Sequence, residues 1–97
     1  MPTYVILANW TDQGIRAISD CPKRIEAAKR LLSEMGGQIK TILMTMGAYD
    51  LVVIYEAPDD AVSARFTLML GRVGNVRTTS MKAFPEEALL HIVESIS

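Results

Sequence analysis

The segment 45–60, with the sequence TMGAYDLVVIYEAPDD, constrains the fold of this chain more than any other part of it. A polar turn with one glycine leads into a run of β-branched and aromatic residues, which favours a β-strand. The run ends at Pro58, and two aspartates then precede apolar residues at helical spacing. The segment therefore predicts a turn, a strand over 50–57 and a helix that begins near Asp59, its N-cap.

Hydrophobic periodicity predicts the other elements. One helix begins near Pro22, where the missing N–H of proline is not needed, and ends at Gly36. Its charged residues, Arg24 among them, fall outside its apolar stripe. We expect strands over 3–10, 38–46, 50–57 and 76–84, a turn or short helix from residue 11, and helices that begin near residues 22, 59 and 85.

The expected element order is β-α-β-β-α-β followed by a terminal helix, which is the ferredoxin-like, or split βαβ, pattern of an α+β domain. Right-handed crossovers then give one antiparallel sheet in spatial order 4-1-3-2, with both long helices on one face. With 97 residues, of which 49% are hydrophobic, the chain suits a single domain over residues 1–97.

The strands carry apolar residues on both of their faces. Val5 and Leu7 oppose the face of Tyr4, Ile6, Ala8 and Trp10, and Val52 and Ile54 oppose the face of Leu51, Val53 and Tyr55. Two helices cover only one face, so the other would expose an apolar patch on the order of several hundred Å², which soluble monomers rarely tolerate. We therefore expect a homodimer closed through its sheets into a dimeric α/β barrel, or a higher homo-oligomer. The terminal helix is the alternative cover for this patch.

The charge pattern argues against two classes of partner. The formal net charge is −1 and both signs are interspersed, whereas nucleic-acid surfaces and basic membrane-surface helices need clustered Lys and Arg. No apolar run approaches the ~20 residues that span a bilayer, and the N-terminus lacks signal-peptide features, so we expect a soluble cytoplasmic protein. Cys21 is the only cysteine, which excludes an intrachain disulfide, and we expect neither a metal nor a cofactor.

The predicted topology places the ends of the first two strands beside the starts of the other two. This edge would gather groups suited to a small, partly polar ligand. The candidate ligand-binding residues there are Trp10, Tyr49, Asp50, Asn75 and Arg77. Structural roles are the alternative, because Asp50 could bond nearby backbone N–H groups or pair with Arg77. Tyr49 could pack in the core or an interface, and Asn75 could form a turn.

His91 is the only histidine, and so the only side chain that ordinarily titrates near neutral pH. It is a sixth candidate, as a proton carrier or as a ligand that oligomerisation brings into a pocket. The alternative is a solvated histidine away from the apolar stripe of the last helix. The six methionines are expected to fill the core.

Several segments of the chain resemble the GYD domain family. They are YVIL (4–7) with TDQG (11–14), PKR (22–24) with EAA (26–28), TMGAYD (45–50) with VVI (52–54) and APDD (57–60), and GNVRT (74–78) with AF (83–84). The name-giving residues stand here as Gly47, Tyr49 and Asp50 with Ala48 between the first two, which we regard as a common form of the motif. The resemblance implies a dimeric α/β barrel similar in shape to small monooxygenases, stress-responsive barrels and amino-acid-sensing domains. It implies no activity, because this fold hosts many.

Three functions are compatible with these observations. The first is a non-enzymatic, homo-oligomeric domain that binds a small metabolite or a protein partner, with a regulatory role. The second is a cofactor-independent monooxygenase or isomerase that uses Tyr49, Asp50 or His91 for proton transfer. The third is a structural subunit whose role is oligomerisation itself.

Overall fold

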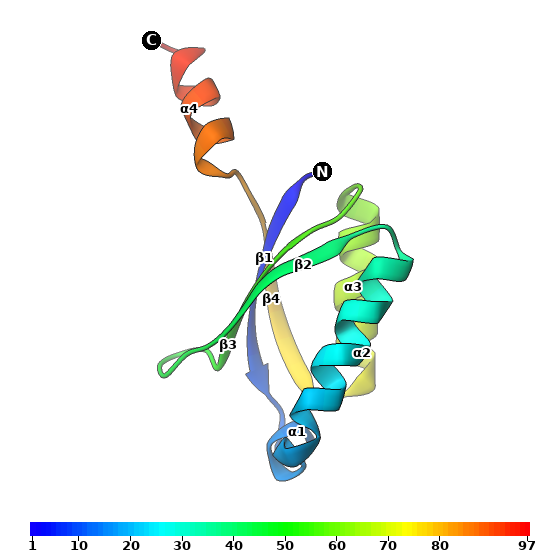
Figure 1. Cartoon of the computed structure of the whole chain (residues 1–97). Coiled ribbons are helices and arrows are strands. Elements are labelled where there is room, and N and C mark those ends of the chain that lie inside the picture. Colours follow the sequence, from blue (N-terminus) through cyan, green and yellow to red (C-terminus); the bar gives the residue numbers. More distant parts are fainter.

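The computed structural model describes residues 1–97 and contains one four-stranded antiparallel sheet with two long helices against one face (Figure 1). The elements in chain order are β1 (Thr3–Trp10), α1 (Asp12–Arg16), the 3-10 helix η1 (Ile18–Asp20), α2 (Cys21–Glu34), β2 (Gln38–Met44), β3 (Leu51–Glu56), α3 (Asp60–Val73), β4 (Val76–Ala83) and α4 (Glu86–Glu94). The strand order β2-β3-β1-β4 is the predicted 4-1-3-2 read from the opposite edge. The α+β class and the sheet order are therefore confirmed.

Helix capping follows the predicted local chemistry. The Thr11 hydroxyl accepts a hydrogen bond from the Gly14 N–H at 3.1 Å and caps α1. The Asp59 carboxylate accepts from the Val62 N–H at 2.9 Å and caps α3, as predicted. α3 ends at Gly74, whose φ of 93° lies in the left-handed region that favours glycine.

The register of the sheet decides which side chains face the helices. Tyr4 lies opposite Tyr55 and Ile6 lies opposite Val53, so these four share one face of β1 and β3. An irregularity in β2 between Ile39 and Thr41 shifts the pairing, and Ile42 then lies opposite Val53. This bulge, which strict alternation does not predict, lets Ile39 and Ile42 face the helices together.

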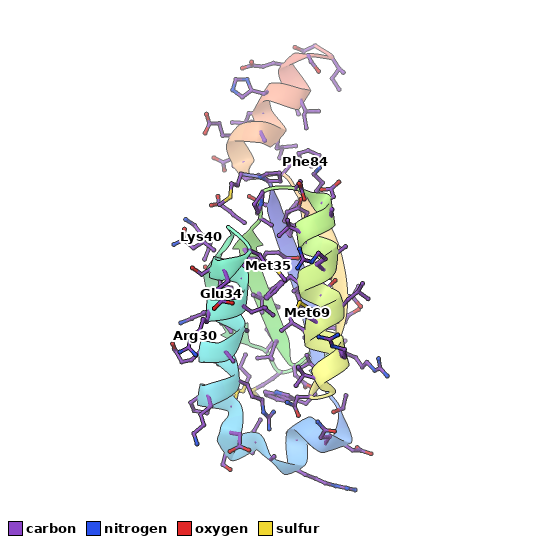
Figure 2. All side chains as sticks on the ribbon, turned by 90° about the vertical axis from the view of Figure 1, so that its right-hand side faces the viewer. Arg30, Glu34, Met35, Lys40, Met69 and Phe84 are labelled. Atoms are coloured by element: carbon purple, nitrogen blue, oxygen red, sulfur yellow. The ribbon has the colours of Figure 1, made fainter.

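The fully buried core lies under the helices and centres on three aromatic rings. The Tyr55 ring stacks on Tyr4 at a centroid distance of 5.4 Å and meets Phe66 edge-on at 5.3 Å. The core residues are Tyr4, Ile6, Ala8, Leu32, Tyr55, Ala57 and Phe66. Figure 2 shows α2 and α3 side by side in front of the sheet, with Met35 and Met69 between them and Arg30 and Glu34 turned outward.

The opposite face of the sheet remains open. Val5, Leu7, Val52 and Ile54 are only half-buried there, and Leu43 and Met81 are 50% and 44% exposed. α4 extends beyond the end of the sheet and does not fold back over it (Figure 1). The alternative in which the terminal helix covers this face is therefore wrong for the single chain. No helix is both long and apolar enough to cross a membrane.

Candidate functional site

The signature loop 45–50 is bound to the end of β1 through Asp50. The Asp50 carboxylate accepts a hydrogen bond from the Trp10 backbone N–H at 3.0 Å. The Asp50 N–H in turn donates to the Ala8 carbonyl at 2.9 Å and to the Asn9 Oδ1 at 3.1 Å. Asp50 therefore joins the β2–β3 loop to the strand at the centre of the sheet.

Two hydrogen bonds from Thr45 connect the two ends of the same loop. The Thr45 hydroxyl donates to the Tyr49 carbonyl at 2.5 Å, and the Thr45 N–H donates to the Asp50 carbonyl at 2.8 Å. These bonds end β2 at Met44, two residues before the predicted end. Tyr49 is half-buried in this turn.

Asn75 fixes α1 against the start of β4. Its carbonyl accepts from the Thr11 N–H at 3.1 Å, and its Oδ1 accepts from the Gln13 Nε2 at 3.0 Å. The Thr11 hydroxyl donates to the Gly74 carbonyl at 2.6 Å. Gly14 is required at this contact, because a Cβ there would lie 2.0 Å from the Asn75 carbonyl oxygen.

Arg77 makes no ion pair with this cluster, and His91 lies apart from it. Arg77 is exposed and lies opposite Asn9 in the register, on the open face of the sheet. The four ion pairs of the chain are Lys29–Glu26, Lys40–Glu56, Lys82–Asp60 and His91–Glu94, so the alternative Asp50–Arg77 pair does not form. His91 is exposed on α4, at the opposite end of the sheet from α1 (Figure 1).

The structure thus brings together only some of the six predicted ligand-binding residues. Trp10 is the last residue of β1, and Asp50 and Asn75 accept hydrogen bonds from the backbone there. Tyr49 lies in the adjoining loop. Trp10 and Asn75 also line a cavity that sequence reasoning missed, whereas Tyr49, Asp50, Arg77 and His91 do not line it.

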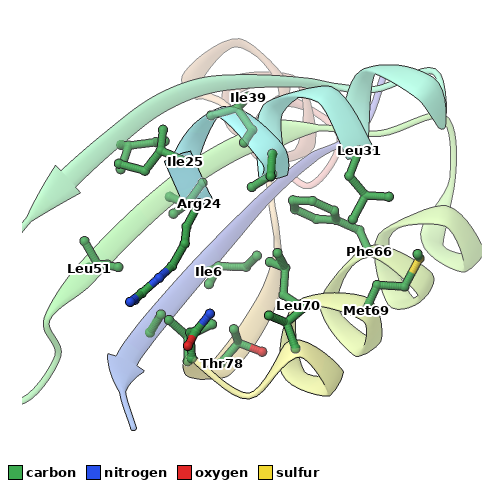
Figure 3. A pocket seen from close by; sticks show the side chains of 18 of the residues that line it. Ile6, Arg24, Ile25, Leu31, Ile39, Leu51, Phe66, Met69, Leu70 and Thr78 are labelled. Atoms are coloured by element: carbon green, nitrogen blue, oxygen red, sulfur yellow. The ribbon is translucent and has the colours of Figure 1, made fainter. Parts of the chain in front are cut away.

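The cavity lies between α2, α3 and the helix-facing side of the sheet, and its volume is about 220 Å³ (Figure 3). Of the 20 residues that line it, 17 are hydrophobic. Small side chains on both sides, including Ala8 of β1 and Ala28 of α2, leave room that larger residues would fill. The three lining residues that are not hydrophobic are Arg24, Asn75 and Thr78.

The prediction that Arg24 falls outside the apolar stripe of α2 is wrong, because Arg24 lines the cavity together with residues of that stripe. It is half-buried, and its guanidinium donates to the Gly14 carbonyl at 3.1 Å and, over a shorter distance, to the Ala17 carbonyl. Its aliphatic stem can cover apolar surface while the charged end binds the carbonyls that end α1. The helical spacing of residues 24, 28, 31 and 35 was the available signal, and the charge of Arg24 obscured it.

A second polar cluster lies at the edge of the core. The buried Tyr4 hydroxyl donates to the Asp60 Oδ1 at 2.6 Å, and the Lys82 Nζ lies 3.1 Å from the same oxygen. Burial, followed by the bond to Asp60, raises the pKa of Tyr4 to about 12. The hydrogen bonds from Tyr4 and Lys82 lower the pKa of Asp60. No group of three or more His, Cys, Asp or Glu side chains is placed to hold a metal ion.

Comparison with known proteins relates this chain to a family, to a curated relative and to a solved structure. The model of the GYD domain family matches residues 4–93. The "Glutamine synthetase and cystathionine beta-lyase binding protein" of Thermus thermophilus is 34% identical over 91 residues, which cover 93% of this chain and 96% of that protein. The crystal structure of TTHA0845, also from Thermus thermophilus, is similar with a TM-score of 0.56 and 21% identity, covering 88% of this chain and 95% of that one. At that identity the structural likeness shows the fold alone.

Proposed function

This chain belongs to the GYD domain family, and from that premise we propose that it is a non-catalytic, homodimeric protein that binds metabolic enzymes. The observation that carries the proposal is the relative named as a binding protein for glutamine synthetase and cystathionine β-lyase. The two proteins align over nearly their whole lengths, which supports assigning the binding role to the region that they share. The proposal keeps the cytoplasmic location expected from the sequence.

The open sheet face is the surface that we assign to self-association. Only 9 of 97 residues are buried in the single chain, so its own core is small. Packing two open faces together would bury the apolar residues of both copies and close two ferredoxin-like domains into a dimeric α/β barrel. Val5, Leu7, Val52 and Ile54 would form the centre of this interface, since they lie on β1 and β3 in the middle of the sheet.

The terminal helix α4 is the surface that we assign to the partner enzyme. It has 9 residues, fewer than the ~12–15 that an isolated helix needs for stability in water. It projects from the body of the chain (Figure 1) and therefore requires another surface to pack against. Its exposed apolar residues are Leu89, Leu90, Ile92 and Val93, and the exposed Ile96 follows its end. Insertion of an amphipathic helix into a groove of the partner is a recurring mode of protein recognition.

The test uses purified glutamine synthetase and cystathionine β-lyase from the same organism as immobilised partners. We expect the wild-type chain to bind at least one of them, and the Leu89→Ser/Val93→Ser variant to bind at least about tenfold more weakly. Leu68→Ser is the matched control, because Leu68 is an apolar residue that is 73% exposed on α3. Failure of the wild type to bind either enzyme, or wild-type affinity in the α4 variant, would contradict the proposal.

The enzyme alternative receives no support from the cavity. None of Tyr49, Asp50 and His91 lines it, so proton transfer by these groups would have to occur outside this apolar cavity. We therefore base the proposed function on binding.

A further inference from the structure

We propose that the cavity between α2, α3 and the sheet binds a small amphipathic carboxylate, with its apolar part along the strands and its carboxylate at Arg24. This site is on the helix side of the sheet, opposite the face assigned to dimerisation, and the inference does not depend on the proposed enzyme partners.

The volume and lining of the cavity set the size and character of the ligand. A dry apolar cavity of ~150 Å³ accepts a molecule the size of benzene, so about 220 Å³ suits a compound with roughly eight to ten non-hydrogen atoms. The hydrophobic lining favours an alkyl chain or a single ring over a polar metabolite.

The polar groups of the lining lie at one end. Figure 3 shows Arg24 and Thr78 on one side of the cavity and Leu31, Phe66 and Met69 on the other. Asn75 belongs to the polar end as well, because its backbone packs against Gly14, whose carbonyl accepts a hydrogen bond from Arg24. The cavity is therefore amphipathic along its length, and a matching ligand has one polar end.

The charge of the lining favours an anionic group at the polar end of the cavity. Arg24 is the only charged residue in the lining, and none of the four ion pairs of the chain includes it. A half-buried guanidinium without a carboxylate partner gains more from an anion than an exposed one does, because less water screens the interaction. No Asp, Glu or His lines the cavity to attract a cation.

The guanidinium is held in position and retains free donors. Its bonds to the Gly14 and Ala17 carbonyls use two of its five N–H groups, so the others remain for a carboxylate. The Asn75 Oδ1 already accepts from Gln13, which leaves the Asn75 amide N–H groups as further donors. The Thr78 hydroxyl can supply another.

The experiment is a titration followed by the fluorescence of Trp10, which is the only tryptophan and lines the cavity. The probes are octanoate, octan-1-ol and octylammonium, which share one alkyl chain and differ in the charge of the polar end. We expect octanoate to bind at least about tenfold more tightly than octan-1-ol, and octylammonium more weakly than either.

Three variants connect this binding to the cavity. Arg24→Met keeps the apolar stem and removes the charge, and we expect it to abolish the preference for octanoate over octan-1-ol. Lys23→Met removes the neighbouring exposed charge and should bind like the wild type. Ala28→Leu fills the cavity and should lower the affinity for all three probes at least about tenfold. This variant tests the location of the site even if Arg24→Met does not fold.

Specific results would overturn the inference. Equal affinities for the three probes in the wild type would show that Arg24 does not discriminate between the charges of their polar ends. Wild-type affinity in Ala28→Leu would show that the probes bind outside the cavity. A Trp10 spectrum that changes with protein concentration, together with no response to octanoate, would assign the cavity to a second copy of the chain and also refute the proposal.

Discussion

The hydroxyl of Tyr4 donates a 2.6 Å hydrogen bond to the carboxylate of Asp60, and so joins the first strand to the first turn of α3. The two residues are 56 positions apart in the chain. Lys82 of β4 approaches the same carboxylate, so the three elements meet at one point.

The alkaline stability of the protein should depend on Tyr4. Above pH 10 an unfolded tyrosine ionises, whereas Tyr4 in the folded chain keeps its proton up to about 12. The folded state then binds more protons than the unfolded state, so the free energy of unfolding falls as the pH rises from about 10 to about 12.

The measurement is urea denaturation as a function of pH. Tyr4→Phe should lose less stability over this range than the wild type, with a residual loss from Tyr55, whose pKa burial also raises. Tyr49→Phe is the control, because the Tyr49 hydroxyl makes no hydrogen bond in the structure, and it should behave like the wild type. An unchanged pH profile in Tyr4→Phe would contradict this prediction.

The signature aspartate should contribute to stability through the Trp10 N–H. Asp50→Ala removes the 3.0 Å acceptor and should lower the free energy of unfolding by about 1–3 kcal/mol, since it leaves a part-buried donor unpaired. Asp50→Asn retains an acceptor oxygen and should cost less. Arg77→Ala, at an exposed position without an ion pair, should change stability by less than about 0.5 kcal/mol. A stable Asp50→Ala protein that no longer binds its partner would instead indicate a direct role in binding.

Two glycines should respond to alanine in opposite directions. Gly14→Ala should lower the free energy of unfolding by about 1–3 kcal/mol or more, because its Cβ would meet the Asn75 carbonyl at 2.0 Å. Gly71→Ala, within α3 and with nothing within 4 Å of the new Cβ, should raise it by about 0.5–1 kcal/mol. Thermal unfolding of the two variants provides the comparison, and a stable Gly14→Ala protein would show that α1 can move away from β4.

The proposed dimer predicts that a charge on the open sheet face separates the two copies. Sedimentation velocity should give twice the mass of the chain for the wild type and the mass of one chain for Ile54→Lys. Leu68→Lys introduces the same charge at an exposed residue of α3 and should remain dimeric. A monomeric wild type at micromolar concentration would refute the sheet-to-sheet assembly.

The sequence determined the order and pairing of the elements. Apolar periodicity located the strands and long helices, Asp59 marked the start of α3, and the handedness of the crossovers fixed the strand order. The motifs between Tyr4 and Phe84 also identified the GYD domain family, which the family model confirms over residues 4–93. These features are local in the chain or follow from general rules of chain connection, so they can be read without coordinates.

Only the tertiary structure decided how the elements meet. Helical spacing says which side of α2 faces inward, but the distance between two helices depends on the side chains of both, so the cavity could not be foreseen. The same holds for the bond between Tyr4 and Asp60, for the separation of His91 from Asp50, and for the direction of α4. Contacts between segments distant in sequence depend on the angles at which the chain leaves each element, and no single segment specifies those angles.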